Sequence, residues 1–288
     1  MQYFLQVYIK TQIDYMLVDY NDSINSKETI HFLHGNGYPP CAYNHILSNF
    51  NSKYLIKLSI LRPLWDNIEP PNFTGWNIFV NDYLNSIKNE KNIIGIGHSI
   101  GANILLKTAL LMPKKFSKLI LLDPTLFIPI KIKIWNIIRK INCQEYFSPL
   151  IKAARNKRMI YNSFDQIFDN YRKKKVFEEF SSDMLKQYIH SITEDTGGVI
   201  RIYYPNDWEA MIYQEGISDD MSIWKNIKDL SPECHIIRGQ KTDVFLSQAA
   251  KLISKKNKAI IIHNVEGGGH LFPFERPDKT ISYLNEII

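Results

Sequence analysis

A serine between two glycines is the clearest candidate for chemistry in the sequence. Residues 97–101 read Gly-His-Ser-Ile-Gly, with Ser99 at the centre. The apolar run 92–96 predicts a buried strand, and 102–112 predicts a helix that ends at Pro113. A tight turn between the two would expose the Ser99 hydroxyl above the sheet, beside the positive end of the helix. We therefore predict that Ser99 is a catalytic nucleophile rather than an incidental serine in a glycine-rich turn.

His270 is the predicted general base for this serine. A serine hydroxyl is a weak nucleophile at neutral pH and needs a base to remove its proton. In a parallel sheet, partners come from loops at the carboxyl ends of strands, and His270 follows the strand predicted at 259–263. Three glycines at 267–269 would let this loop fold tightly. The alternative for His270 is a purely structural role.

Two aspartates are candidates for the acid that orients the histidine. Asp243 follows the strand predicted at 234–237, and it gives the chain order serine, aspartate, histidine. We therefore predict Asp243 as the acid, although it could instead cap the helix that begins after it. Asp123 follows the strand predicted at 118–122 and is the alternative acid.

An oxyanion site requires two backbone N–H donors aimed at one point. Ile100, the residue after the predicted nucleophile, supplies the first. The second is expected after the strand at 29–33, where residues 34–37 read His-Gly-Asn-Gly. We assign it to the backbone of Asn36, against the alternative that this stretch is only a glycine turn.

The elements that must position these residues alternate between strand and helix. The sequence predicts eight strands, at 4–9, 15–20, 29–33, 54–60, 92–96, 118–122, 234–237 and 259–263. This alternation is typical of an α/β fold with a mostly parallel sheet covered on both faces. Between the sixth and seventh strands, helical patterns follow one another with no convincing strand. We therefore predict a core of 1–124 and 229–288, with 125–228 as an inserted helical segment that roofs the sheet.

The composition is typical of a globular protein. The 288 residues are 45% hydrophobic and 22% charged. No run is long enough for an integral membrane helix, and the start of the chain lacks the pattern of a signal peptide. Three scattered cysteines fit neither a disulfide nor a metal spacing, so we expect free thiols and a cytoplasmic protein without metal or cofactor.

The net charge of +6 is concentrated in one band between about 130 and 175. Its basic residues are Lys131, Lys133, Arg139, Lys140, Lys152, Arg155, Lys157, Arg158, Arg172, Lys173, Lys174 and Lys175. A solvated helical face explains such a band, and contact with an anionic surface is the alternative. No nucleic-acid-binding module accompanies it, so nucleic acid is not expected as a partner. The sequence does not indicate an oligomeric state.

Taken together, these motifs resemble the α/β-hydrolase superfamily, in its serine-nucleophile, esterase-like branch. The similarity rests on 34–37, 97–101, the Asp243 loop and His270, which stand in the order found in that superfamily. It implies an eight-stranded hydrolase sheet, and it implies that 125–228 is a helical cap. One departure is the stretch 60–65, Ile-Leu-Arg-Pro-Leu-Trp, where many relatives have an Asp-x-Arg-Gly-His-Gly turn.

The resemblance and the residues together predict a serine hydrolase that cleaves a small or medium carboxylic ester. Ser99 would attack the acyl carbon, His270 would transfer the proton, and Asp243 would orient His270. The alternatives are an acyltransferase or a carbon–carbon bond hydrolase on the same three residues, and a non-catalytic binding protein with this fold. The expected partner is a small-molecule acyl substrate.

Overall fold

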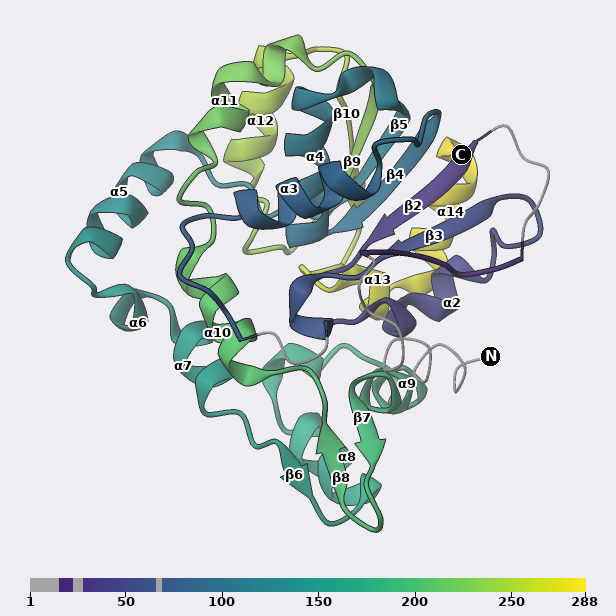
Figure 1. Ribbon diagram of the computed structural model, residues 1–288, viewed down its shortest axis with the longest axis vertical. Coiled ribbons are helices and arrows are strands. Elements are labelled where there is room, and N and C mark those ends of the chain that lie inside the picture. The colour runs from purple at the N-terminus through teal and green to yellow at the C-terminus, as the bar shows by residue number, and fades with distance from the viewer. Residues whose placement is uncertain (1–15, 23–27, 66–68) are drawn as a thin grey trace.

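A seven-stranded sheet forms the centre of the computed structural model, which describes residues 16–22, 28–65 and 69–288 (Figure 1). Its strands are β1 (Leu17–Asp19), β2 (Thr29–Leu33), β3 (Leu55–Ser59), β4 (Ile93–His98), β5 (Phe116–Leu122), β9 (Glu233–Gly239) and β10 (Ile261–Val265). Their order is β1-β3-β2-β4-β5-β9-β10; β1 is antiparallel to β3, and the other neighbours are parallel. Within the described residues the sheet has seven strands rather than the eight expected, and the strand expected at 4–9 lies outside those residues.

Successive side chains along the strands point alternately into two hydrophobic layers, one on each face of the sheet. In β5, Ile120 and Leu122 belong to one buried cluster, whereas Leu119 and Leu121 belong to the other. This period of two is the geometry of a strand buried on both faces.

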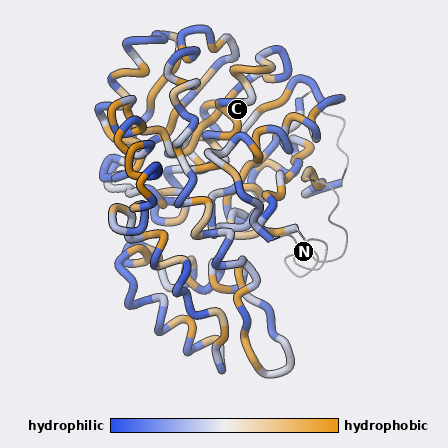
Figure 2. The backbone as a smooth tube through the Cα atoms, turned by 60° about the vertical axis from the view of Figure 1, so that its left-hand side comes forward, coloured by the Kyte–Doolittle hydropathy of each residue, from blue (hydrophilic) through white to orange (hydrophobic). Residues whose placement is uncertain are grey.

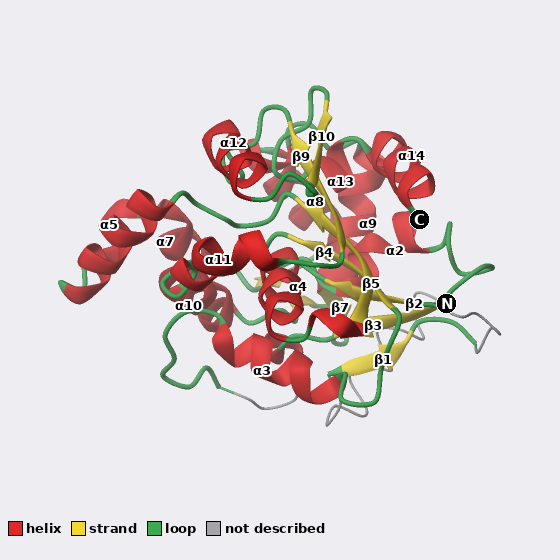
Figure 3. Ribbon diagram, turned by 90° about the horizontal axis from the view of Figure 1, so that it is seen from above, coloured by secondary structure: helices red, strands yellow, loops and turns green. Residues whose placement is uncertain are grey.

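Helices cover both of these faces (Figure 3). One face carries α3 (Asn77–Ser86), α4 (Ile100–Leu111) and α12 (Ser247–Lys256). The other carries α2 (Asn44–Leu47), α13 (Phe272–Glu275) and α14 (Pro277–Ile287). The sheet is thus a rigid, doubly covered platform whose strand ends can hold side chains in place.

The segment between β5 and β9 contains most of the remaining helices. They are α5 (Pro129–Lys140), α6 (Gln144–Phe147), α7 (Pro149–Arg155), α8 (Phe164–Arg172), α9 (Ser182–Ile192), α10 (Asn206–Glu215) and α11 (Met221–Asn226). It also holds a small sheet of order β6-β8-β7, made of β6 (Ile160–Tyr161), β7 (Thr193–Asp195) and β8 (Ile200–Ile202). The expectation that no strand occurs here was wrong, because strands of two or three residues are too short to show a period of two.

This inserted segment packs on the core through aromatic side chains. The rings of Tyr188 and Tyr38 are stacked with centroids 4.8 Å apart, and those of Phe180 and Phe274 lie 5.5 Å apart. Such offset ring pairs stabilise a contact beyond the area that they bury. None of the helices within the described ranges is long and apolar enough to cross a membrane.

Candidate active site

Ser99 lies in a strained turn that joins β4 to α4. Its φ of 58° is in the left-handed region, which is unfavourable for a residue with a side chain. A Cβ atom on Gly101 would collide with the carbonyl of Leu33, and one on Gly97 would lie 2.7 Å from the nitrogen of Ala102. The two glycines therefore allow the turn to pack tightly enough to hold the serine in this conformation.

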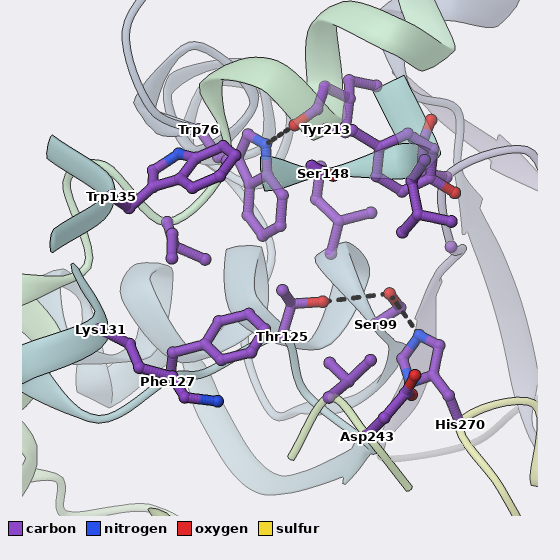
Figure 4. A pocket seen from close by; sticks show the side chains of 18 of the residues that line it. Trp76, Ser99, Thr125, Phe127, Lys131, Trp135, Ser148, Tyr213, Asp243 and His270 are labelled. Atoms are coloured by element: carbon purple, nitrogen blue, oxygen red, sulfur yellow. Dashed lines mark hydrogen bonds between the residues drawn. The ribbon is translucent and has the colours of Figure 1, made fainter. Parts of the chain in front are cut away.

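The structure brings His270 against Ser99, as the sequence predicts. The distance from His270 Nε2 to Ser99 Oγ is 3.0 Å (Figure 4). On the other side of the ring, Nδ1 lies 2.6 Å from Oδ2 of Asp123. A hydroxyl, an imidazole and a carboxylate joined in this order can turn the hydroxyl into a nucleophile.

Asp123 is held in place by two further donors. The backbone N–H of Gly239 donates to Oδ1 over 3.1 Å, and the Thr242 hydroxyl donates to Oδ2 over 2.5 Å. The Asp123 side chain is fully buried. Its φ of 40° departs from extended backbone, so the chain turns directly after β5. With His270, these donors make three hydrogen bonds to the buried carboxylate and hold it in the orientation that faces the imidazole.

The geometry does not bring Asp243 to His270, so the predicted pairing is corrected to Asp123. Asp243 is exposed on the wall of the cavity described below, and no hydrogen bond joins it to another described residue. The physical reason is that the N–H of Gly239, at the end of β9, and the hydroxyl of Thr242, in the loop after it, both point toward Asp123. Asp243, one residue later, is left exposed on the wall of the cavity.

His98 links the two loops that flank the serine, a role that sequence reasoning missed. Its Nε2 lies 3.0 Å from the carbonyl of His270, and its Nδ1 lies 2.7 Å from the hydroxyl of Tyr43. Because a carbonyl only accepts, Nε2 carries the proton and Nδ1 accepts from Tyr43. The Tyr43 oxygen in turn accepts from the N–H of Gly35 over 3.2 Å.

Burial keeps this connecting histidine neutral. Burial, together with the neighbouring His270, lowers the pKa of His98 to about 3. A neutral ring is the form that can donate from one nitrogen and accept at the other. The chain from Gly35 to His270 therefore fixes the glycine loop relative to the imidazole beside Ser99.

Both residues assigned to the oxyanion site line the cavity beside Ser99. Ile100 is the first residue of α4, so its N–H belongs to the helix positions that have no acceptor within the helix. The side chain of Asn36 donates to the Glu209 carbonyl over 3.0 Å and accepts from the Tyr204 hydroxyl over 3.0 Å. These bonds from the inserted segment fix the loop that presents the Asn36 backbone.

Thr125 is a second residue that sequence reasoning did not single out. Its Oγ1 lies 3.1 Å from Ser99 Oγ (Figure 4). Its carbonyl accepts from the side chain of Asn103 over 2.9 Å, and Asn103 also donates to the buried carboxylate of Asp220 over 3.0 Å. Lys107, also buried, pairs with Asp220 over 2.8 Å. A buried polar network from α4 to the end of the inserted segment thus supports the hydroxyl that contacts Ser99.

A cavity of about 520 Å³ opens over Ser99 (Figure 4). Its walls are mainly apolar side chains, most of them from the inserted segment: Trp76, Phe127, Ile134, Trp135, Ile138, Phe147, Leu150, Val176, Ile212, Tyr213, Ile217 and Leu271. Lys131 is the one lysine or arginine among the described residues that line it. Such a size and lining suit a small organic molecule with apolar groups. Within the described ranges, no group of three metal-ligating side chains occurs.

Comparisons with known proteins agree on the fold. The sequence pattern of the family described as "Alpha/beta hydrolase family" matches residues 32–282. No curated protein is significantly similar to the chain in sequence. Many solved structures are similar to it in fold.

Three of these structures show the range of the similarity. An E-2-(acetamidomethylene)succinate hydrolase has a TM-score of 0.74 at 14% identity, with 94% of this chain and 93% of that chain covered. A peroxisomal alpha-beta-hydrolase from Saccharomyces cerevisiae has a TM-score of 0.72 at 18% identity, with 94% and 80% covered. A thermophilic esterase from Thermogutta terrifontis has a TM-score of 0.62 at 13% identity, with 94% and 91% covered.

Proposed function

The chain belongs to the alpha/beta hydrolase family, and we propose that it is a serine hydrolase that cleaves a small or medium carboxylic ester. The observation that carries this proposal is the hydrogen-bonded series Ser99, His270, Asp123 at the floor of an apolar cavity. In this proposal 1–124 and 229–288 form the catalytic core, and 125–228 forms the cap that binds the acyl group.

The reaction begins with proton transfer from Ser99 to His270. As the serine oxygen attacks the acyl carbon, Nε2 of His270 takes its proton, and the imidazolium is stabilised by the Asp123 carboxylate at Nδ1. The carbonyl oxygen becomes an oxyanion, for which the N–H groups of Ile100 and Asn36 are the proposed donors. The bond from carbon to the leaving oxygen then breaks, and His270 gives its proton to the departing alcohol.

Hydrolysis of the acyl-enzyme repeats these steps with water. His270 takes a proton from the water that attacks the acyl carbon, and the bond to Ser99 Oγ breaks as the proton returns to that oxygen. The products are a carboxylic acid and the free serine. Thr125 fits a positioning role in both halves, because its hydroxyl lies close enough to hold Ser99 Oγ in the rotamer that faces His270.

The cavity supports an apolar acyl group as the substrate class. Aromatic and aliphatic side chains dominate its walls. Replacement of water there by an acyl chain would therefore lower the free energy of the complex. A highly charged acyl group would find only Lys131 as a cationic partner among the described lining residues.

A fluorophosphonate probe tests this proposal directly. We expect it to label the native protein on Ser99 and to leave the Ser99→Ala protein unlabelled. Acyl esters of graded chain length, matched thioesters and a β-diketone then separate ester hydrolysis from thioester and carbon–carbon cleavage, and added alcohols reveal acyl transfer. A folded protein that is neither labelled nor active on any of these would refute the serine mechanism.

A further inference from the structure

Helix α5 and Ile141, the residue that caps its C-terminus, present a row of apolar side chains to solvent. Ile130, Ile134, Ile137 and Ile141 are 56%, 49%, 61% and 62% exposed. At roughly 100° per residue, these four positions fall within an arc of about 60° on the helix surface. The same helix buries Ile132 on the opposite side and Ile138 about 40° beyond one edge of the row, so the exposed row is not needed to attach α5 to the protein.

The exposed apolar surface continues onto the two helices that follow. Tyr146, Phe147 and Leu150 are 89%, 63% and 54% exposed. Of the thirteen large hydrophobic side chains that are exposed among the described residues, seven lie within 130–150. Such a concentration marks an interaction surface, because single exposed apolar residues are normally scattered. We call these seven residues the apolar patch. Figure 3 shows α5 projecting away from the central sheet, and Figure 2 turns this side of the molecule forward.

Basic side chains border this patch on both sides. On the surface of α5, Lys133 and Lys140 lie beside one edge of the isoleucine row, and Lys131 lies on the other side of the row, just beyond the buried Ile138. Residues 129–155 contain six lysines and arginines and a single acidic residue, Glu145, which leaves +5 of the chain's +6 net charge in this segment. An apolar helix face with lysines along its edges is the pattern of a helix that lies in a membrane interface.

We propose that α5–α7 dock on an anionic lipid surface, with the apolar patch in the lipid and the lysines at the headgroups. The positive charge of residues 129–155 favours an anionic lipid surface over a second copy of the chain as the partner of the patch. Two copies meeting through the patch would bring two segments of net charge +5 together, whereas anionic headgroups neutralise them. Docking by this surface does not depend on which reaction the protein catalyses.

The position of the patch also suggests how a substrate would reach the cavity when the protein is docked on lipid. Ile134, Phe147 and Leu150 are at once exposed and part of the cavity wall, so the patch is continuous with the cavity over Ser99. An acyl ester held in the lipid could therefore enter the cavity without crossing bulk water. This second step rests on the proposed esterase function; the docking itself does not.

Vesicle flotation with the full-length Ser99→Ala protein tests the docking without turnover. The vesicles are phosphatidylcholine alone, or equimolar phosphatidylcholine and phosphatidylglycerol. We expect the protein to float with the anionic vesicles, to bind the neutral ones far less, and to dissociate as salt increases. The pair Ile137→Gln/Ile141→Gln and the pair Lys133→Gln/Lys140→Gln, none of which lines the cavity, should each weaken binding roughly tenfold or more.

Matched variants elsewhere on the surface serve as controls. Leu111→Gln/Ile261→Gln removes comparably exposed apolar side chains, and Lys255→Gln/Lys256→Gln removes two exposed lysines of α12. Both should bind like the parent, and thermal unfolding checks that all variants are folded.

Absence of binding to anionic vesicles, or equal binding by patch and control variants, would overturn the proposal. Self-association that only the patch variants abolish would instead assign the patch to a second copy. If the Ser99→Ala protein binds the anionic vesicles but the native protein hydrolyses no ester, the result would count against the proposed function and not against the docking.

Discussion

The carboxyl edge of the sheet and the inserted segment contribute to the site by different physical means. At the sheet edge, Ser99, Asp123 and His270 are fixed by hydrogen bonds and by backbone turns that only the surrounding structure can hold. In the inserted segment, the cavity wall consists mainly of apolar side chains, some of which, such as Phe147 and Leu150, are more than half exposed. Bond geometry at the edge is suited to the reaction, and apolar contact in the wall is suited to selecting a substrate. Substitutions in the two regions should therefore change different kinetic quantities.

The largest effect is expected at the sheet edge, from the residue that orients His270. Asp123→Asn should lower kcat by about 10⁴-fold, because an amide stabilises the wrong tautomer and cannot stabilise an imidazolium. Asp243→Asn should change kcat by less than a few-fold, since Asp243 is exposed and has no hydrogen bond to His270. Steady-state kinetics on one soluble ester compare the two variants. If Asp243→Asn caused the greater loss, the assignment of the acid to Asp123 would be wrong.

The residues that local sequence can reveal are the ones that local backbone geometry dictates. The pattern Gly-His-Ser-Ile-Gly between an apolar strand and a helix identifies Ser99, because a turn this tight needs glycine on both sides. The glycine-rich loop before His270 similarly indicates a close approach to the sheet. The structure does bring these two side chains together.

The acid and its supports depend on information that no local pattern contains. Asp123 reaches His270 because β5 lies directly beside β4, where the Ser99 N–H donates to the Leu122 carbonyl over 3.0 Å. Strand order is a property of the whole sheet, so a sequence that offers an aspartate after each of two strands does not decide between them. Thr125 and His98 were missed for the same reason, since each acts through partners far away in the chain.

The next effect concerns the connection that His98 makes between the glycine loop and His270. His98→Phe should lower kcat by roughly 10² with little change in KM, because a small displacement of the base is costly to the reaction. Tyr43→Phe removes one hydrogen bond of the same chain, and it should cause a smaller loss in the same direction. Unfolding measurements confirm that either variant is folded. A fall in kcat/KM that came entirely from KM would contradict a positioning role for His98.

Acid should destabilise the folded protein through histidines that are buried in their neutral form. Burial lowers the pKa of His98 to about 3 and that of His34 to about 4 in the folded protein, whereas both titrate near 6.5 when unfolded. Between these values the unfolded chain binds protons that the folded one does not, so stability is fully present above pH 6.5 and falls as the pH decreases. Each histidine contributes a slope of about 1.4 kcal/mol per pH unit. Chemical denaturation at several pH values measures the slope of the free energy of unfolding against pH. His34→Gln should reduce this slope by the contribution of one histidine. An unchanged free energy of unfolding from pH 6.5 to 4.5 would contradict the buried neutral state.

The smallest effect separates two neighbouring aromatic residues of α6 in the inserted segment. Phe147 lines the cavity and is 63% exposed, whereas Tyr146 is 89% exposed and lies outside the lining. Phe147→Ala should raise KM for a soluble octanoyl ester roughly threefold to tenfold, because only part of the ring's apolar area is available to the acyl chain. Its kcat should stay the same, and the acetyl ester of the same alcohol should be unaffected. Tyr146→Ala is the matched control and should leave both esters unchanged. If Phe147→Ala lowered kcat for the acetyl ester as well, the wall would contribute to the reaction itself, and the separation between sheet edge and inserted segment would fail.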